Sequence, residues 1–235
     1  MPDEIILLAG TAATIGFVHT IFGPDHYLPF IVLSKAGQWS KLRTIIITFI
    51  CGIGHILSSV VLGFIGIFLG IAAFKLEVIE AFRGDLAAWF LIAFGFTYFI
   101  WGIHRAFRSK PHKHFHLHKN GEVHTHHHKH FREHSHINSN RYSNNLTPWI
   151  LFTIFVFGPC EPLIPLLMYP AANHNILYVG IIVSIFGLTT IATMLAIVMA
   201  SLYGLTKITL TERYSHAVAG LVIFLCGSSI KFLGL

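Results

Sequence analysis

The chain of 235 residues is far more apolar than a soluble protein of its length. The residue types AVILMFWYC make up 54% of it, charged residues make up only 11%, and the mean hydropathy is +0.68, whereas roughly a quarter of a soluble domain is charged. This composition excludes a soluble enzyme, and the 21 phenylalanines exclude a disordered chain. We therefore expect the net charge of +6 to set orientation in a membrane rather than to bind nucleic acid.

Six apolar blocks are long enough to cross a bilayer as helices, which requires about 20 residues each. In chain order they cover residues 5–33, 44–73, 86–104, 148–172, 176–204 and 216–234. The sequence therefore predicts an all-α polytopic membrane protein with six transmembrane helices and the lipid bilayer as its surroundings. Residues 1–104 hold the first three spans, residues 105–147 form a long loop, and residues 148–235 hold the last three. We expect no tightly bound cofactor and no enzymatic activity, while the association of several copies stays open.

The loops differ in their content of positive charge. Those that follow the first, third and fifth spans carry 13 lysines and arginines, whereas the other side of the membrane receives only Lys75, Arg83 and Lys231. Cytoplasmic loops are enriched in lysine and arginine. We therefore expect a multi-pass protein of the cytoplasmic membrane, with both termini outside the cytoplasm and the loop at 105–147 inside it.

The first and fourth spans share a motif. The sequence IFGPD at 21–25 is matched 135 residues later by VFGPC at 156–160. Because each half holds three spans, an odd number, the halves enter the membrane in opposite senses and form an inverted three-plus-three repeat. Proline removes a helical hydrogen bond, so helices 1 and 4 are expected to be broken at Gly-Pro. Paired breaks of this kind are the best sequence pointer to the substrate site of a transporter.

Ionisable side chains accompany the break in the first span. Asp25 directly follows Gly-Pro, and a carboxylate at mid-bilayer costs about 2.5–3.5 kcal/mol unless it has a partner or an aqueous lining. His19 and His26 are two helical turns apart, and His55 lies in the second span beside two glycines that permit close helix packing. Imidazole and carboxylate ligands suit divalent Ni, Co or Zn. The group predicts a metal site, or a proton relay built from the same residues.

The fourth span offers two further candidate ligands, Cys160 and Glu161, which follow the second Gly-Pro. A thiolate from Cys160 would favour softer or tetrahedral metals. Glu161 is interpreted as a carboxylate that either binds the metal or carries a coupling proton. Cys51 and Cys226 are interpreted as packing residues.

Residues 112–136 contain eleven histidines, a density that predicts a chelating segment for Ni, Co, Zn or Cu. A three-residue turn at 119–121 ending in glycine predicts a β-hairpin. Its register places opposite one another the pairs His116 and His124, His114 and His126, and His112 and His128, with His118 next to the turn. A two-residue turn would instead scatter the histidines over both faces.

The run HTIFGPDH at 19–26, the pair Gly54-His55 and the internal histidine-rich loop resemble the nickel/cobalt transporter families. The likeness is greatest to the small urease-accessory-like transmembrane proteins and the nickel/cobalt resistance exporters. The resemblance implies transport of Ni²⁺ or Co²⁺, with Zn²⁺ open, and a metal-binding role for His19, Asp25, His26 and, more weakly, His55. A chelating loop in the cytoplasm fits capture of excess internal metal for export, which is slightly favoured, or sensing and storage of metal after import. The permease pattern has four residues between its first histidine and Asp-His, whereas five intervene here.

The second half resembles a different branch of the same broad superfamily. Its FGPC at 157–160, followed by Pro162 and Pro165, is similar to the thiol-disulfide electron carriers of cytochrome c biogenesis. Those carriers need one cysteine in each inverted half, and Asp25 stands at the matching position here. Two alternatives therefore remain: a thiol-disulfide electron carrier, or an exporter of sulfite or another organic anion, which the chelating loop argues against.

Overall fold

The computed structural model describes residues 2–108, 113–117, 123–127, 146–172, 176–204 and 212–234. Its first half consists of α1 (Pro2–Phe22), the 3₁₀ turn η1 (Pro24–His26), α2 (Leu28–Ala36), α3 (Lys41–Phe68) and α4 (Ala73–Arg108). Its second half consists of α5 (Leu146–Phe157), α6 (Leu163–Ala172), α7 (Ile176–Gly204), the 3₁₀ turn η3 (Glu212–Tyr214) and α8 (Ser215–Leu233). Between the halves lie two short strands, β1 (Lys113–Leu117) and β2 (Val123–His127).

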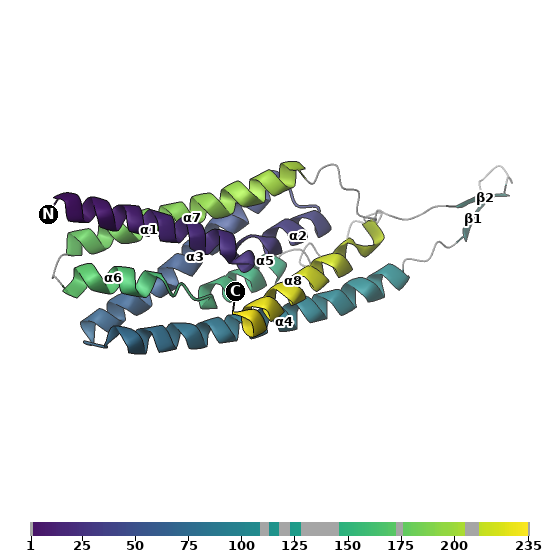
Figure 1. Cartoon of the computed structure of the whole chain (residues 1–235). Helices are drawn as coiled ribbons and strands as arrows, with labels where there is room; N and C mark the ends of the chain where they lie inside the picture. The colour runs from purple at the N-terminus through teal and green to yellow at the C-terminus, as the bar shows by residue number, and fades with distance from the viewer. Residues whose placement is uncertain are drawn as a thin grey trace.

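The helices run roughly along one common direction (Figure 1). The adjoining ends of α2 and α3, of α4 and α5, and of α7 and α8 lie at one end of the bundle, with the strands beyond it. The N-terminus lies at the opposite end. This arrangement places the helix ends next to the loops that follow the first, third and fifth predicted spans at one end of the molecule.

Five of the described helices, rather than six, are long and apolar enough to cross a membrane: α1, α3, α4, α7 and α8. The fourth predicted span, 148–172, is instead divided between α5 and α6, of 12 and 10 residues. The first predicted span likewise runs through α1 into α2. The third predicted span, 86–104, is shorter than the helix it corresponds to, because α4 begins at Ala73. The first part of α4 contains charged residues, so a search for uninterrupted apolar residues leaves it out.

Glycines set the distances between the central helices. A Cβ at Gly54 would lie 2.8 Å from the ring of Phe152 on α5, and one at Gly52 would lie 3.2 Å from Ile191 on α7. Small residues let helix backbones approach closely in a membrane. Helix α3, which carries His55, is therefore held closely between α5 and α7. Its first turn is capped by Ser40, whose Oγ accepts a hydrogen bond from the Arg43 N–H at 3.2 Å.

Large apolar side chains cover the outside of the bundle. Phe68 is 88% exposed, and many other leucines, isoleucines and phenylalanines on the long helices are exposed as well. Contiguous apolar surface of this extent is typical of a membrane-facing protein. Both the helix lengths and the exposed apolar faces indicate a multi-pass membrane protein.

The two strands pair antiparallel in the predicted register. His116 is opposite His124, His114 is opposite His126, and Leu117 is opposite Val123. The predicted hairpin register is thus confirmed for these pairs. The remaining loop histidines of the prediction, His112, His118 and His128, lie outside the described residues.

Candidate metal centre at the helix breaks

The first Gly-Pro lies where α1 gives way to η1. Helix α1 ends at Phe22, and the Gly23 N–H still donates to the His19 carbonyl at 3.0 Å. Pro24 then begins the 3₁₀ turn that carries Asp25 and His26. Gly23 has a further role, because a Cβ there would collide with the ring of His26 and lie 3.0 Å from the Asp25 carboxylate. Glycine is needed here to leave room for the histidine ring.

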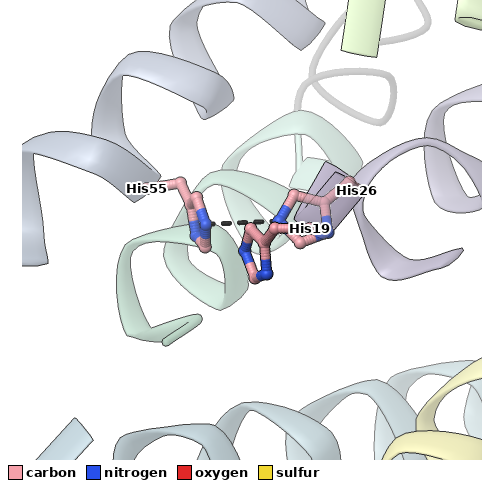
Figure 2. Close-up of side chains that lie close together, drawn as sticks. All are labelled: His19, His26 and His55. Atoms are coloured by element: carbon pink, nitrogen blue, oxygen red, sulfur yellow. Dashed lines mark hydrogen bonds between the residues drawn. The ribbon is translucent and has the colours of Figure 1, made fainter. Parts of the chain in front are cut away.

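Three histidines from separate elements meet at this point: His19 on α1, His26 in η1 and His55 on α3 (Figure 2). One ring nitrogen from each lies within 4.8 Å of the others. The ring centroid of His26 lies 4.7 Å from that of His19 and 5.0 Å from that of His55. His26 and His55 are only 2% and 1% exposed. The structure thus brings together three of the predicted ligands in a group that we call the three-histidine cluster.

Hydrogen-bond acceptors around the cluster assign the tautomers of two rings. Nδ1 of His26 lies 3.1 Å from the Gly23 carbonyl and 3.1 Å from the Asp25 carboxylate. Nδ1 of His55 lies 3.4 Å from the Phe155 carbonyl. Because all three oxygens only accept, each Nδ1 carries the hydrogen, and a neutral ring then has a lone pair on Nε2.

The Nε2 atoms of His26 and His55 face each other at 3.3 Å. With both rings neutral, two lone pairs point at one another, an arrangement that a shared cation relieves. The Nε2 atom of His19 is also buried and has no hydrogen-bond partner among the described residues. Three imidazole nitrogens, the facing Nε2 atoms of His26 and His55 and the Nε2 atom of His19, are therefore collected in one buried place.

The outer contacts of these rings match those of metal-binding histidines, which usually donate the other N–H to a carboxylate or a backbone carbonyl. Asp25 provides the carboxylate for His26, and Phe155 provides the carbonyl for His55. Asp25 was predicted as a ligand, but its contact is with Nδ1, on the far side of the ring from His55. Its side chain is 23% exposed. We interpret it as the group that orients His26 and increases its basicity.

The second Gly-Pro also serves the cluster. In an unbroken helix the Phe155 carbonyl would accept from residue 159, but Pro159 has no N–H. The carbonyl accepts instead from the Gly158 N–H at 3.1 Å and from His55 Nδ1 at 3.4 Å. A Cβ at Gly158 would lie 3.0 Å from His55 Nδ1, so glycine again makes room for a histidine ring. Both breaks thus meet the three-histidine cluster, one through His26 and the other through His55.

Two predicted ligands lie outside the three-histidine cluster. Cys160 is fully buried, and its backbone N–H donates to Glu80 at 3.2 Å. Glu161 is exposed. The buried carboxylate at the second break is instead Glu80, which is 0% exposed.

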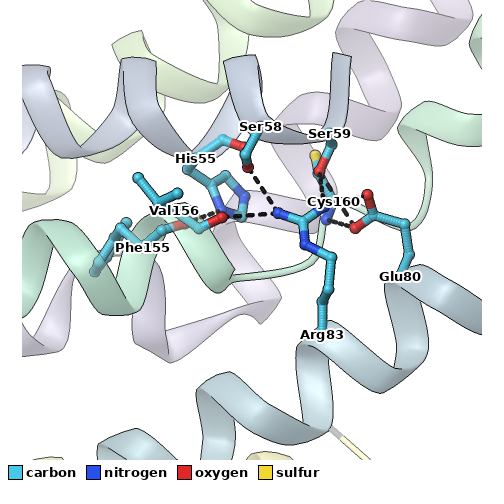
Figure 3. Close-up of polar contacts among 8 residues, drawn as sticks. All are labelled: His55, Ser58, Ser59, Glu80, Arg83, Phe155, Val156 and Cys160. Carbon is cyan, nitrogen blue, oxygen red and sulfur yellow. Dashed lines mark hydrogen bonds and ion pairs between the residues drawn. The ribbon is translucent and has the colours of Figure 1, made fainter. Parts of the chain in front are cut away.

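The sequence interpretation missed Glu80 and its partner Arg83, which form an ion pair on α4 (Figure 3). From the sequence, Asp25 and Glu161 are expected to be the only two acidic residues deep in the spans; the fully buried Glu80 shows that this expectation is wrong. The sequence does contain one indication of this ion pair: two residues of opposite charge lie three positions apart, next to an apolar block, a spacing at which side chains meet on a helix. The pair was assigned to a loop because the span was expected to start at residue 86.

All three cysteines of the chain, Cys51, Cys160 and Cys226, are buried free thiols. A family model described as the cytochrome C biogenesis protein transmembrane region matches residues 28–228. The match begins at the start of α2, after the first Gly-Pro motif and η1, and it includes the second Gly-Pro motif and most of α8. Comparisons with curated proteins and with solved structures gave no match.

Proposed function

The chain belongs to the family of the cytochrome c biogenesis protein transmembrane region, and within that family we propose that it transports a divalent transition-metal ion through the three-histidine cluster. Ni²⁺ or Co²⁺ is the expected cargo, with Zn²⁺ also compatible with an imidazole site. The observation that carries the proposal is the facing pair of Nε2 atoms of His26 and His55. When both rings are neutral, the acceptors on Nδ1 leave a lone pair on each of these Nε2 atoms, and a metal ion binds such lone pairs directly.

The packing of the cluster supports this proposal over a purely structural role. A buried histidine that only fills space would normally satisfy both ring nitrogens. Here the His19 Nε2 atom has no hydrogen-bond partner within the described part of the chain. Buried polar groups in a membrane are costly and mark pathways for ions and protons. A transported cation would satisfy all three rings at once.

An inverted repeat would place the cluster near the centre of a transporter. Gly95 on α4 lies against residues 223–224 of α8, and Gly227 on α8 lies against residues 91–92 of α4. Each of these residues differs from its counterpart by 132, as a two-fold axis between α4 and α8 would require. Helix α1 packs on α7 as α5 packs on α3, and α2 packs on α7 as α6 packs on α3. These reciprocal contacts support a three-plus-three repeat with α1–α2 and α5–α6 as its broken helices.

The histidine-rich segment supports a metal as cargo. We propose that its histidines, including those of β1 and β2, collect metal on the cytoplasmic side and raise its local concentration. A chelator on that side fits best with capture of excess internal metal for export. The positive charge of the three loops at this end supports the cytoplasmic assignment.

Family membership favours a second candidate, a thiol-disulfide electron carrier. Such a carrier oxidises two thiols to one disulfide and passes on two electrons, with release of two protons. Cys160 occupies the second break, but Asp25 stands at the matching place of the first, so the dithiol would have to form between Cys160 and Cys51 or Cys226. The cysteine content therefore favours the metal as cargo.

Flux measurements with the purified protein in sealed vesicles test the proposal. We expect radioactive nickel or cobalt to cross the membrane of vesicles with the native protein, and His26→Ala and His55→Ala to abolish this flux. His216→Gln is the matched control, since His216 is a partly buried histidine paired with Tyr98 away from the cluster.

A variant without cysteines separates the two candidates. Replacing Cys51, Cys160 and Cys226 by alanine should preserve most of the metal flux. The electron carrier would be favoured if the native protein passed none of the three metals but transferred electrons between thiols and disulfides, and if the variant without cysteines lost this electron transfer.

A further inference from the structure

Helix α4 contributes an ion pair to the break between α5 and α6. The Arg83 guanidinium donates to the Glu80 carboxylate at 2.5 Å, and its second terminal nitrogen donates to Ser58 Oγ at 2.8 Å. The other Glu80 oxygen accepts from Ser59 Oγ at 3.3 Å. The Glu80 side chain is fully buried, and that of Arg83 is 15% exposed. Buried charges of this kind persist only when they are paired and hydrogen-bonded, as they are here.

The pair also contacts the main chain on both sides of the break. Arg83 donates to the Val156 carbonyl at 2.7 Å, and Glu80 accepts from the Cys160 N–H at 3.2 Å. In a continuous α-helix the N–H of residue 160 would donate to the carbonyl of residue 156. The two groups that this missing hydrogen bond leaves free are thus bound by the two charged side chains of one ion pair (Figure 3).

We propose that the Glu80–Arg83 ion pair is a pin that replaces this main-chain hydrogen bond, holds the α5–α6 break in its shape and thereby positions His55. The link to His55 is one residue long, because the carbonyl that accepts from its Nδ1 belongs to Phe155, next to Val156. Ser58, which follows His55 by one turn of α3, is bound by the same guanidinium. Arg83 therefore fixes both the ring's acceptor and the helix that carries the ring.

The two breaks are held in different ways. At the first break the chain supplies its own contacts, since the His26 N–H donates to the Gly23 carbonyl and the Tyr27 hydroxyl donates to the Ile21 carbonyl. At the second break the chain also makes main-chain contacts of its own, such as that from the Leu163 N–H to the Cys160 carbonyl, but the contacts to the Val156 carbonyl and the Cys160 N–H come from α4, in the other half of the chain. The second break is therefore the one whose shape depends on a removable pair of side chains.

Cys160 is a native reporter for the pin. Its thiol is fully buried beside the break, whereas Cys51 and Cys226 are buried elsewhere, on α3 and α8. We expect Arg83→Met to raise the rate of maleimide labelling at Cys160 by about tenfold or more, because local opening exposes groups without global unfolding. Rates at Cys51 and Cys226, followed by mass spectrometry in the same sample, should stay unchanged. Asp85→Asn is the matched control, because Asp85 lies on α4 like Arg83 but forms its ion pair with Lys231 on α8.

The double variant Glu80→Gln with Arg83→Met separates the pin from the effect of one orphaned charge. It removes both charges, yet it still leaves the Val156 carbonyl without its donor, so Cys160 should remain more reactive than in the native protein. Arg83→Lys keeps a donor for that carbonyl and should restore part of the protection. Native labelling rates in Arg83→Met or in the double variant, or an equal rise at all three cysteines, would overturn the proposal.

The positioning of His55 rests on the proposed metal site, and bound Co²⁺ reports it through its visible absorption spectrum. We expect Arg83→Met to change the cobalt spectrum, Arg83→Lys to restore part of it, and Asp85→Asn to leave it unchanged. An unchanged spectrum in Arg83→Met would overturn the positioning role. These spectra are recorded with the loop histidines replaced by serine in every variant. Failure of that protein to bind cobalt would contradict the metal site instead, while the labelling of Cys160 would still test the pin.

Discussion

The Nε2 atoms of His26 and His55 face each other at 3.3 Å, and the Nδ1 atom of each ring faces an oxygen that can only accept. The Asp25 carboxylate fixes one ring, and the Phe155 carbonyl, which Pro159 deprives of its helical donor, fixes the other. Proline at the second break thus has a chemical consequence in addition to interrupting a helix. It supplies the acceptor that turns the lone pair of His55 toward His26.

Asp25 should control the affinity of the site without being one of the three imidazole ligands. Asp25→Asn keeps an oxygen for the His26 N–H but removes the negative charge, and loss of such a supporting group typically weakens metal binding by about 10–100-fold. Isothermal titration of the purified protein with Ni²⁺ measures the effect. Asp85→Asn is the control, since Asp85 is 58% exposed and pairs with Lys231. Equal affinities of the native protein and Asp25→Asn would remove Asp25 from the site.

Gly23→Ala should disrupt the cluster although it adds only one methyl group. The new Cβ would overlap the ring of His26, so the ring has to leave its place beside His55. We expect nickel binding to be lost or reduced by about tenfold or more, as expected when one ligand is displaced. Gly10→Ala, on the preceding helix α1, is the matched control, because a Cβ there meets nothing within 4 Å. The account would fail here if both alanine variants bound nickel as the native protein does.

The reciprocal glycine contacts between α4 and α8 predict similar costs at equivalent positions. Gly95→Val and Gly227→Val each place a branched side chain against the backbone of the other helix, and overpacking typically costs about 1–3 kcal/mol. Thermal unfolding in detergent should show comparable losses for the two variants. Gly180→Val, at a glycine with open space around it, should cost less. A large loss at only one of the two contact glycines would argue against equivalent halves.

The histidine-rich segment should affect the concentration at which transport saturates rather than the maximal flux. Replacing its histidines by serine removes the chelator but leaves the three-histidine cluster intact. In vesicles we expect native flux at saturating nickel and reduced flux at low nickel. Loss of flux at saturating nickel would show that the segment belongs to the translocation path.

The sequence predicts the membrane character, the three histidines and the strand register, because these depend on local patterns. Apolar blocks reveal the spans, HTIFGPDH places two histidines beside the first break, and the turn at 119–121 sets which loop histidines are opposite. The contact between His26 and His55 depends on the packing of α3 against η1, and the sequence suggests it only through Gly54 and the family resemblance.

Other features depend on tertiary partners that a sequence does not display. Glu80 and Arg83 look like residues of an aqueous loop, since hydropathy counts each charge as exposed until its partner is known. The fourth span also resembles one long helix by composition, yet Gly158 and Pro159 divide it, and the freed main-chain groups are bound by side chains from α3 and α4.

X-ray absorption spectroscopy of bound nickel tests the central claim most directly. The sample is the protein whose loop histidines are replaced by serine, so that any tightly held metal reports the membrane site. We predict one nickel per chain with three imidazole ligands, and loss of this metal in His26→Ala. Absence of bound nickel, or a bound nickel whose spectrum is the same in His26→Ala, would contradict the account.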